Sequence, residues 1–95
     1  MIVRISGIGQ YELDDAGVRK LDELDTELTN ALNEGQEQRF HEILRSTIEF
    51  ICQNGTEVSV ETVVPSDVIV PPDDITMEEA RQFFTDEGLM APLPA

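Results

Sequence analysis

The sequence predicts an α+β domain: a small antiparallel β-hairpin or three-stranded sheet packed on an αα-hairpin, with a short C-terminal helix. Three observations support this prediction. The N-terminus is rich in β-branched residues, two long central segments carry apolar residues at helical spacing, and a proline-rich extended stretch precedes a helix-capping motif. We expect a single domain over residues 1–88, followed by a flexible tail over residues 89–95.

The N-terminal segment is predicted to form two strands, at about residues 1–5 and 10–13. Glycines in the connection over residues 6–9 can adopt the positive φ that tight hairpins often require. A phosphate-binding loop is the rival interpretation. It is disfavoured because Glu12 stands where a dinucleotide fingerprint needs its third glycine, and no Gly-Lys-Ser/Thr follows.

Two amphipathic helices are predicted next, at about residues 15–33 and 36–53. Asp14 or Asp15 can cap the first helix, Gly35 supplies its stop, and Gly55 ends the second helix. The connection between them is short, so we expect an antiparallel pair. The apolar positions at helical spacing are Val18, Leu21, Leu24, Leu28 and Leu32 in the first helix, and Phe40, Ile43, Leu44, Ile48 and Ile51 in the second.

The C-terminal part begins with valines that indicate extended backbone. Residues 68–70 are predicted to add a third strand to the hairpin, and the flanking prolines should keep that strand at an edge. Thr76 and Glu79 have the spacing of a capping box, which predicts a short helix from there to about Asp86. Its apolar face would consist of Met77, Ala80, Phe83 and Phe84.

The chain is strongly acidic, with six Lys and Arg against twenty Asp and Glu and a formal charge of −14. Such a surface repels nucleic-acid phosphates and anionic lipid headgroups, which disfavours direct nucleic-acid binding and membrane insertion and favours a basic protein partner. Cys52 is the only cysteine, so no intrachain disulfide can form, and no signal peptide or long apolar run is apparent. We therefore expect a cytoplasmic protein, reaching a membrane only through a partner.

No residue pattern predicts an enzyme, a cofactor or a metal site. His41 is interpreted as a surface histidine on the polar face of its helix, and Cys52 as a packed or interface thiol, because neither has the neighbours of a catalytic pair. The acids in the C-terminal part lack the loop spacing of a calcium site, and two of them suit a first helical turn. These acids are Asp67, Asp73, Asp74, Glu78 and Glu79.

Asp25 falls at the edge of the first helix's apolar stripe. We expect it to reach water there; the alternative is burial beside Arg4, Arg39 or Arg45. The two apolar stripes together are wide, which suggests either a homo-oligomer or docking onto another helix; the alternative is a monomer closed by its third helix and the tail from Leu89 to Leu93. Candidate partner-binding residues are Phe50, Cys52, Asp67, Asp73, Asp74, Phe83 and Phe84.

The chain resembles the PspA-associated family, called PspAA, over nearly all of residues 1–86. The resemblance rests on the pattern I-V-R-I-x-G-x-G-Q-Y-x-L-D-D at residues 2–15, on Val64-Pro65-Ser66-Asp67 through Pro71-Pro72, and on Thr76-x-Glu78-Glu79-Ala80-Arg81. It implies a small cytoplasmic protein acting alongside PspA, a coiled-coil protein of the envelope stress response related to membrane-remodelling filament proteins. The family offers no catalytic residues to carry over.

These observations together predict a non-enzymatic protein–protein interaction module, an accessory or regulator of a PspA-type stress response with a PspA-like coiled-coil partner. Two other functions stay open: an acidic decoy that mimics nucleic acid, and a small metal-binding protein using Asp73, Asp74 and their neighbours.

Overall fold

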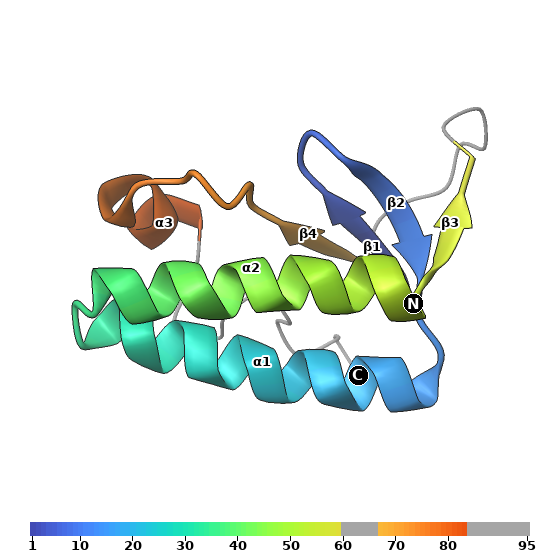
Figure 1. The fold of residues 1–95 in the computed structure, drawn as a ribbon, viewed down its shortest axis with the longest axis horizontal. Coiled ribbons are helices and arrows are strands. Elements are labelled where there is room, and N and C mark those ends of the chain that lie inside the picture. The colour runs from blue at the N-terminus through green and yellow to red at the C-terminus, as the bar shows by residue number, and fades with distance from the viewer. Residues whose placement is uncertain (60–66, 84–95) are drawn as a thin grey trace.

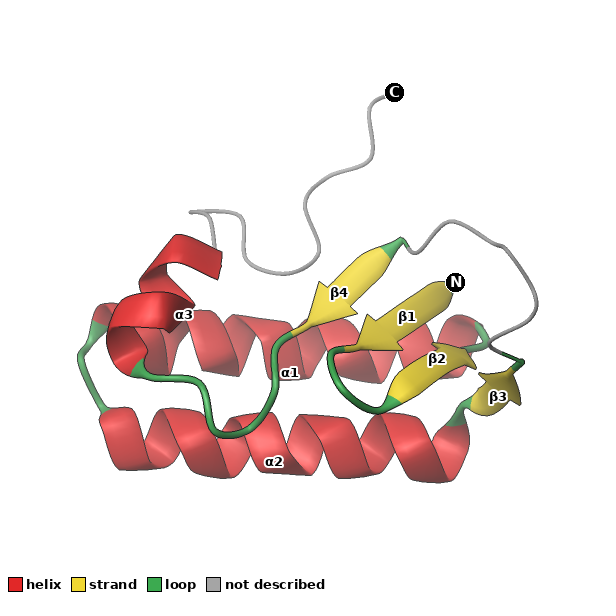
Figure 2. Cartoon of the chain, turned by 90° about the horizontal axis from the view of Figure 1, so that it is seen from above, coloured by secondary structure: helices red, strands yellow, loops and turns green. Residues whose placement is uncertain are grey.

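The computed structural model describes residues 1–59 and 67–83, and these form a two-layer α+β fold (Figure 1). The elements are β1 (Ile2–Ile5), β2 (Gly9–Glu12), α1 (Asp15–Asn33), α2 (Glu37–Asn54), β3 (Thr56–Val58), β4 (Val68–Val70) and α3 (Met77–Phe83). Figure 2 shows the strands and α3 on the same side of the helical hairpin, with α3 towards the connection between the two helices. The predicted α+β class is confirmed.

The sheet has four strands in the order β3-β2-β1-β4. β1 pairs antiparallel with β2 through a connection at residues 6–8, where Gly7 has φ +81°, so the opening glycines serve a hairpin as predicted. β4 pairs parallel with β1 and lies at the predicted edge, with Val3 opposite Val68. β3 is an addition: it continues directly from α2 and pairs with β2 at the other edge.

The helix ends follow local rules that the sequence displays. The Asp14 carboxylate accepts a hydrogen bond of 2.8 Å from the Gly17 backbone N–H, which satisfies a donor left free in the first turn of α1. Gly35, at φ +69°, reverses the chain between α1 and α2. The Thr76 hydroxyl accepts from the Glu79 N–H at 3.1 Å, which confirms the capping box at the start of α3.

The core lies between the helical hairpin and the layer formed by the sheet and α3. Alternate residues of β1 and β4, such as Val3 and Val70, point towards the helices and are buried, while Ile69 faces outward. Ile75 and Ala80 close the far end of the same core. The helical members are Leu21, Leu28, Ala31, Leu32, Phe40, Leu44, Ile48 and Ile51.

The apolar stripes of α1 and α2 are thus covered within one chain. Among the described residues, the large apolar side chains that stand exposed are Ile8 and Ile69, at 55% and 48%. Phe84 and the predicted tail at residues 89–95 lie outside the described residues, as does the end of the third helix expected near Asp86.

Asp25 corrects a prediction, because its exposed fraction is only 4% and it does not reach the solvent. The carboxylate lies between core positions on α1, since Leu21 and Leu28 flank it by one turn on either side. Helical spacing marks such a residue as a boundary position. Whether the boundary is covered depends on how closely other elements pack over it, which spacing does not reveal.

Leu28 provides a test of the shared core. Its side chain is fully buried beneath the sheet layer, so Leu28→Ala should lower the free energy of unfolding by about 2–5 kcal/mol through lost burial and a cavity. Urea denaturation followed by circular dichroism measures the change. The control is Ile8→Ala in the exposed β1–β2 turn, which should change it by less than about 0.5 kcal/mol; equal effects would contradict the described core.

Candidate partner-binding surface

The charges of the described residues separate cleanly from the core. All six Lys and Arg side chains are exposed, and every described Asp and Glu except Asp25 is exposed as well. The acids outnumber the bases, so the surface carries a negative field that attracts basic partners over a Debye length of about 8 Å at physiological salt.

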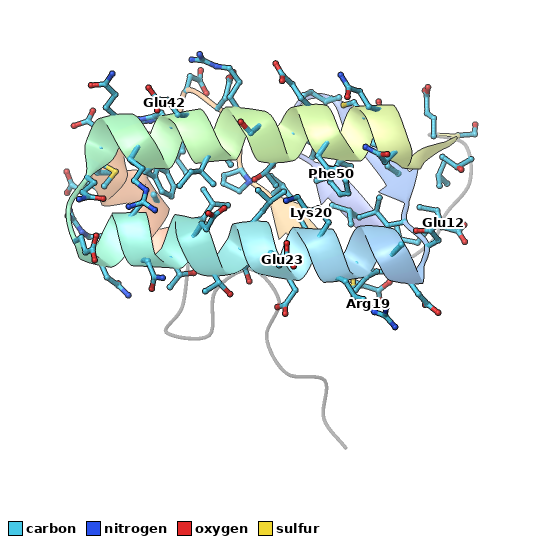
Figure 3. The ribbon with its side chains drawn as sticks, turned by 60° about the horizontal axis from the view of Figure 1, so that its bottom comes forward. Glu12, Arg19, Lys20, Glu23, Glu42 and Phe50 are labelled. Carbon is cyan, nitrogen blue, oxygen red and sulfur yellow. The ribbon has the colours of Figure 1, made fainter. Side chains whose placement is uncertain are left out.

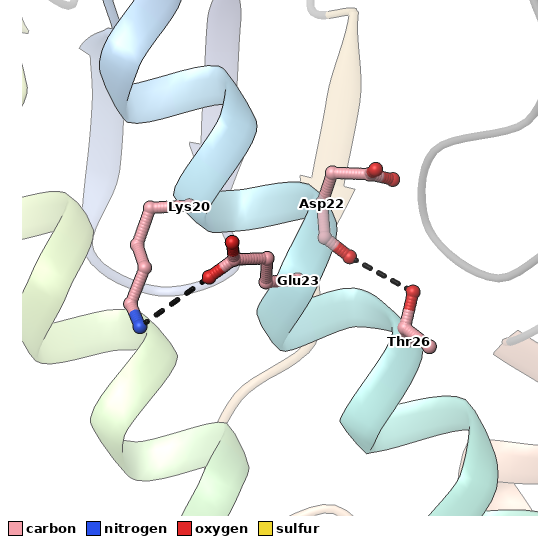
Figure 4. Close-up of polar contacts among 4 residues, drawn as sticks. All are labelled: Lys20, Asp22, Glu23 and Thr26. Atoms are coloured by element: carbon pink, nitrogen blue, oxygen red, sulfur yellow. Dashed lines mark hydrogen bonds and ion pairs between the residues drawn. The ribbon is translucent and has the colours of Figure 1, made fainter.

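Few of these charges neutralise one another closely. Lys20 Nζ lies 3.7 Å from Glu23 Oε2 on α1, with both side chains more than half exposed, as Figure 4 shows. Arg45 Nε on α2 lies 4.0 Å from Asp73 Oδ2 and is similarly exposed. Exposed pairs of this kind contribute about 0–1 kcal/mol, so they leave the surrounding field largely intact.

One acidic segment lies next to α2, and we call residues 71–83 the strap. It runs from the end of β4 along α2 and ends in α3 (Figure 1). Asp73, Asp74 and Glu78 are exposed on it, and Arg81 is its one base. Pro71, Ile75 and Ala80 are buried on the side of the strap that faces the core. A hollow beside α3 is lined by Pro72, Asp74, Ile75, Glu79 and Gln82.

A second hollow lies on the neighbouring face of α2 and is lined by Glu37, Gln38, His41, Glu42 and Arg45. His41, which lines this hollow, has its Nε2 atom 2.6 Å from the carbonyl oxygen of Ile75, which lines the first hollow, at the junction of α2 and the strap. Carboxylates therefore stand on both sides of this junction, from α2 and from the strap. His41 is half-buried at this junction.

Asp73 and Asp74 lie together on the strap, whereas Phe50, Cys52 and Asp67 lie on other elements. Asp67 accepts a hydrogen bond of 2.9 Å from the Ile2 N–H and so holds the start of β4 against β1. Phe50 is half-buried against the core, and Figure 3 shows it between the two long helices beside Lys20. The side chains of Phe83 and Phe84 lie outside the described residues.

Cys52 is exposed and free on α2, so the structure does not bear out a packed thiol. Its sulfur interacts with the Tyr11 hydroxyl of β2. The hydrogen bond to Cys52 and the charge on that sulfur, followed by burial and the nearby Glu57 carboxylate, raise the pKa of Tyr11 above its usual 10.0. Sequence spacing gave no sign of this pair, because the two residues lie 41 positions apart and meet only when β2 packs against α2.

Within residues 1–59 and 67–83, no three His, Cys, Asp or Glu side chains converge in a way that could hold a metal ion. Over the same residues, neither long helix has an apolar stretch sufficient to span a bilayer.

The Tyr11–Cys52 pair predicts a measurable titration. Tyr11 is the only tyrosine and the chain has no tryptophan, so absorbance near the phenolate band reports it alone. Because the folded-state pKa is raised, the neutral phenol is favoured on folding; this stabilisation is present below about pH 10 and is lost as the pH rises through the folded-state pKa. Cys52→Ala should lower the pH of phenol ionisation.

Glu57→Gln serves as the control, because Glu57 contributes least to the raised pKa. It should lower the ionisation pH less than Cys52→Ala does. An unchanged midpoint in Cys52→Ala would show that the sulfur does not influence the phenol.

The whole chain was compared with known proteins. A family model described as PspA-Associated protein matches residues 1–92. A search of curated proteins and a search of solved structures found no match. The matched stretch includes the β-hairpin, both long helices, the strap and its capping box, and the chain therefore belongs to the PspA-associated protein family.

Proposed function

We propose that this protein is a non-enzymatic binding module that acts as an accessory of a PspA-type coiled-coil protein. The family membership supports the association with PspA. The observation that carries the mode of binding is the strap, on which exposed Asp73 and Asp74 stand beside the carboxylates of α2. A basic segment of the partner is the complement of such a surface.

The rigid underside of the strap supports this function. Ile75 is anchored in the core at 7% exposure, and the capping box fixes the start of α3, so the acids that flank Ile75 are held by ordered backbone. Binding a basic segment there would cost little ordering of the strap. By binding one assembly state of the partner better than another, the module would shift that equilibrium without chemistry of its own.

Cytoplasmic location follows from this proposal and not from the fold. The partner would operate at the inner face of the envelope, and an acidic module would reach anionic lipid only through it. The nucleic-acid decoy makes a different prediction, since duplex DNA would then compete with the partner for the same protein.

Charge reversal on the strap tests the proposed surface. Asp73→Lys with Asp74→Lys should weaken binding to the purified PspA-type protein of the same host by about tenfold or more, equivalent to about 1.4 kcal/mol. Calorimetry or interferometry at low salt measures the affinity. Raising the salt should weaken the unmodified complex, because the Debye length falls from about 30 Å at 0.01 M to about 3 Å at 1 M.

The matched control is Asp22→Lys with Glu23→Lys, an adjacent exposed pair on α1 that makes the same change in net charge (Figure 4). It should weaken binding by less than about threefold, since screening limits the effect of distant charges. An equal loss of affinity in both double variants would show that binding depends on the net charge of the protein and not on the strap. A complex insensitive to salt and to both variants would refute electrostatic recognition.

A further inference from the structure

The sheet has a second face, which is turned away from the helical hairpin. The valines of β1 and β4 are buried towards the helices, so Arg4 and Ile69, which are paired in register, lie on the outer face. The register continues this row through Gln10 on β2 to Val58 on β3. We call these four residues the outer row; it crosses all four strands, and Figure 2 views the strands from this side.

The outer row is apolar at both ends and carries a cation between them. Ile69 is 48% exposed at one end, and Val58 is half-buried at the other. Arg4 is exposed, and no carboxylate within residues 1–59 or 67–83 forms an ion pair with it. Gln10 Oε1 is shielded from water and has no hydrogen-bond donor within the same two ranges. A fitting occupant therefore brings apolar side chains, a carboxylate and a free N–H.

The area of this face limits what can occupy it. Four strands about 4.8 Å apart, each of three or four residues at about 3.3 Å per residue, present a face of about 200 Å². A separate protein, including a second copy of this chain, needs about 800 Å² on each side for a stable interface. A segment of the same chain needs less, because its tether gives it an effective concentration in the millimolar range.

The chain continues beyond α3 with a segment of the required composition. Within residues 84–95, two acids are followed by three large apolar residues: Asp86 and Glu87, then Leu89, Met90 and Leu93. Pro92 and Pro94 lack the N–H that a strand at a sheet edge donates to its neighbour. The composition thus suits a segment that lies across the face of a sheet and not one that extends the sheet at its edge.

The position of α3 brings this segment within reach of the outer row. Figure 2 shows β4 pointing towards α3, which ends at Phe83. Twelve residues can span up to about 40 Å when extended, about twice the width of the four strands. The family match also runs on to residue 92, so most of this segment lies within the matched region.

We propose that residues 84–95 dock on the outer row of the same molecule, with the carboxylates of Asp86 and Glu87 at Arg4 and the apolar side chains over Ile69. The apolar contact removes the exposed part of Ile69 from water, and the carboxylates give Arg4 the counter-charge that the rest of the face lacks. The occupant is part of the chain itself. The inference therefore goes beyond the proposed function and needs no external partner.

Nuclear magnetic resonance of the unmodified full chain tests this docking. Nuclear Overhauser contacts should join the methyl groups of Ile69 to those of Leu89 or Leu93. The contacts should persist on dilution and should be absent between labelled and unlabelled copies in a mixed sample, because site and occupant belong to one molecule.

Charge variants test the proposed role of Arg4. Arg4→Glu should weaken docking by about two- to fivefold, because the change removes an exposed ion pair. The Ile69 methyl shift measures docking, with the double variant Leu89→Ser and Leu93→Ser as the undocked reference. Adding Asp86→Arg and Glu87→Arg to Arg4→Glu should restore docking.

The matched control is Arg19→Glu, which changes an exposed base on α1 and makes the same change in net charge (Figure 3). It should leave the Ile69 methyl shift unchanged, because α1 lies on the opposite side of the sheet from the outer row. Circular dichroism of each variant shows whether α1 and α2 remain folded while docking is measured.

Three results would overturn the proposal. One is a full chain in which no contact joins Ile69 to residues 84–95. Another is contact between different copies, which would assign the face to self-association. The third is an equal loss of docking in Arg4→Glu and Arg19→Glu, which would remove the role of Arg4. None of these results bears on partner binding by the strap, which the Asp73 and Asp74 variants measure separately.

Discussion

The apolar inner faces of the two long helices must be buried, and the other described elements are four short strands and one short helix. α1 and α2 present Leu28 and Phe40 towards the opposite layer, and that layer is assembled from both ends of the described chain. β1 and β2 come from the start, whereas β4 and α3 come from the end. Every other feature of the fold, including the mixed sheet and the course of the strap, follows from covering these two helical faces.

The small size of the core also determines where the charged side chains lie. A 95-residue chain has too little interior to hold many ionised groups, and burying a carboxylate is costly, so nearly all the described acids are at the surface. The negative field is therefore a product of a small core combined with a composition rich in Asp and Glu. Asp25 on α1 is the departure, since only 4% of it is exposed.

Features encoded by neighbouring residues could be predicted from the sequence, and features encoded by distant ones could not. The cap at Asp14, the reversal at Gly35 and the Thr76–Glu79 box are local, and each occurs as predicted. The strand β3 has only three residues, too few to show an alternation of apolar and polar side chains. It forms because it pairs with β2, and this contact is not visible in the sequence. The contact of His41 with Ile75 joins residues 34 positions apart through a backbone oxygen. A pattern of side chains along the sequence does not predict such a contact.

The strap combines two roles that are usually separate in a small domain. Its buried side, through Ile75 and Ala80, completes the core, while its outer side presents Asp73 and Asp74 to the solvent. A partner that bound these acids would bind to a segment whose packing against the helices contributes to the stability of the fold. Under the proposed function, binding there would be coupled to closing the core, because a ligand that prefers the docked strap stabilises it by its differential affinity. In a domain this small, a bound partner would therefore change the stability of the core packing without a second domain or a long hinge.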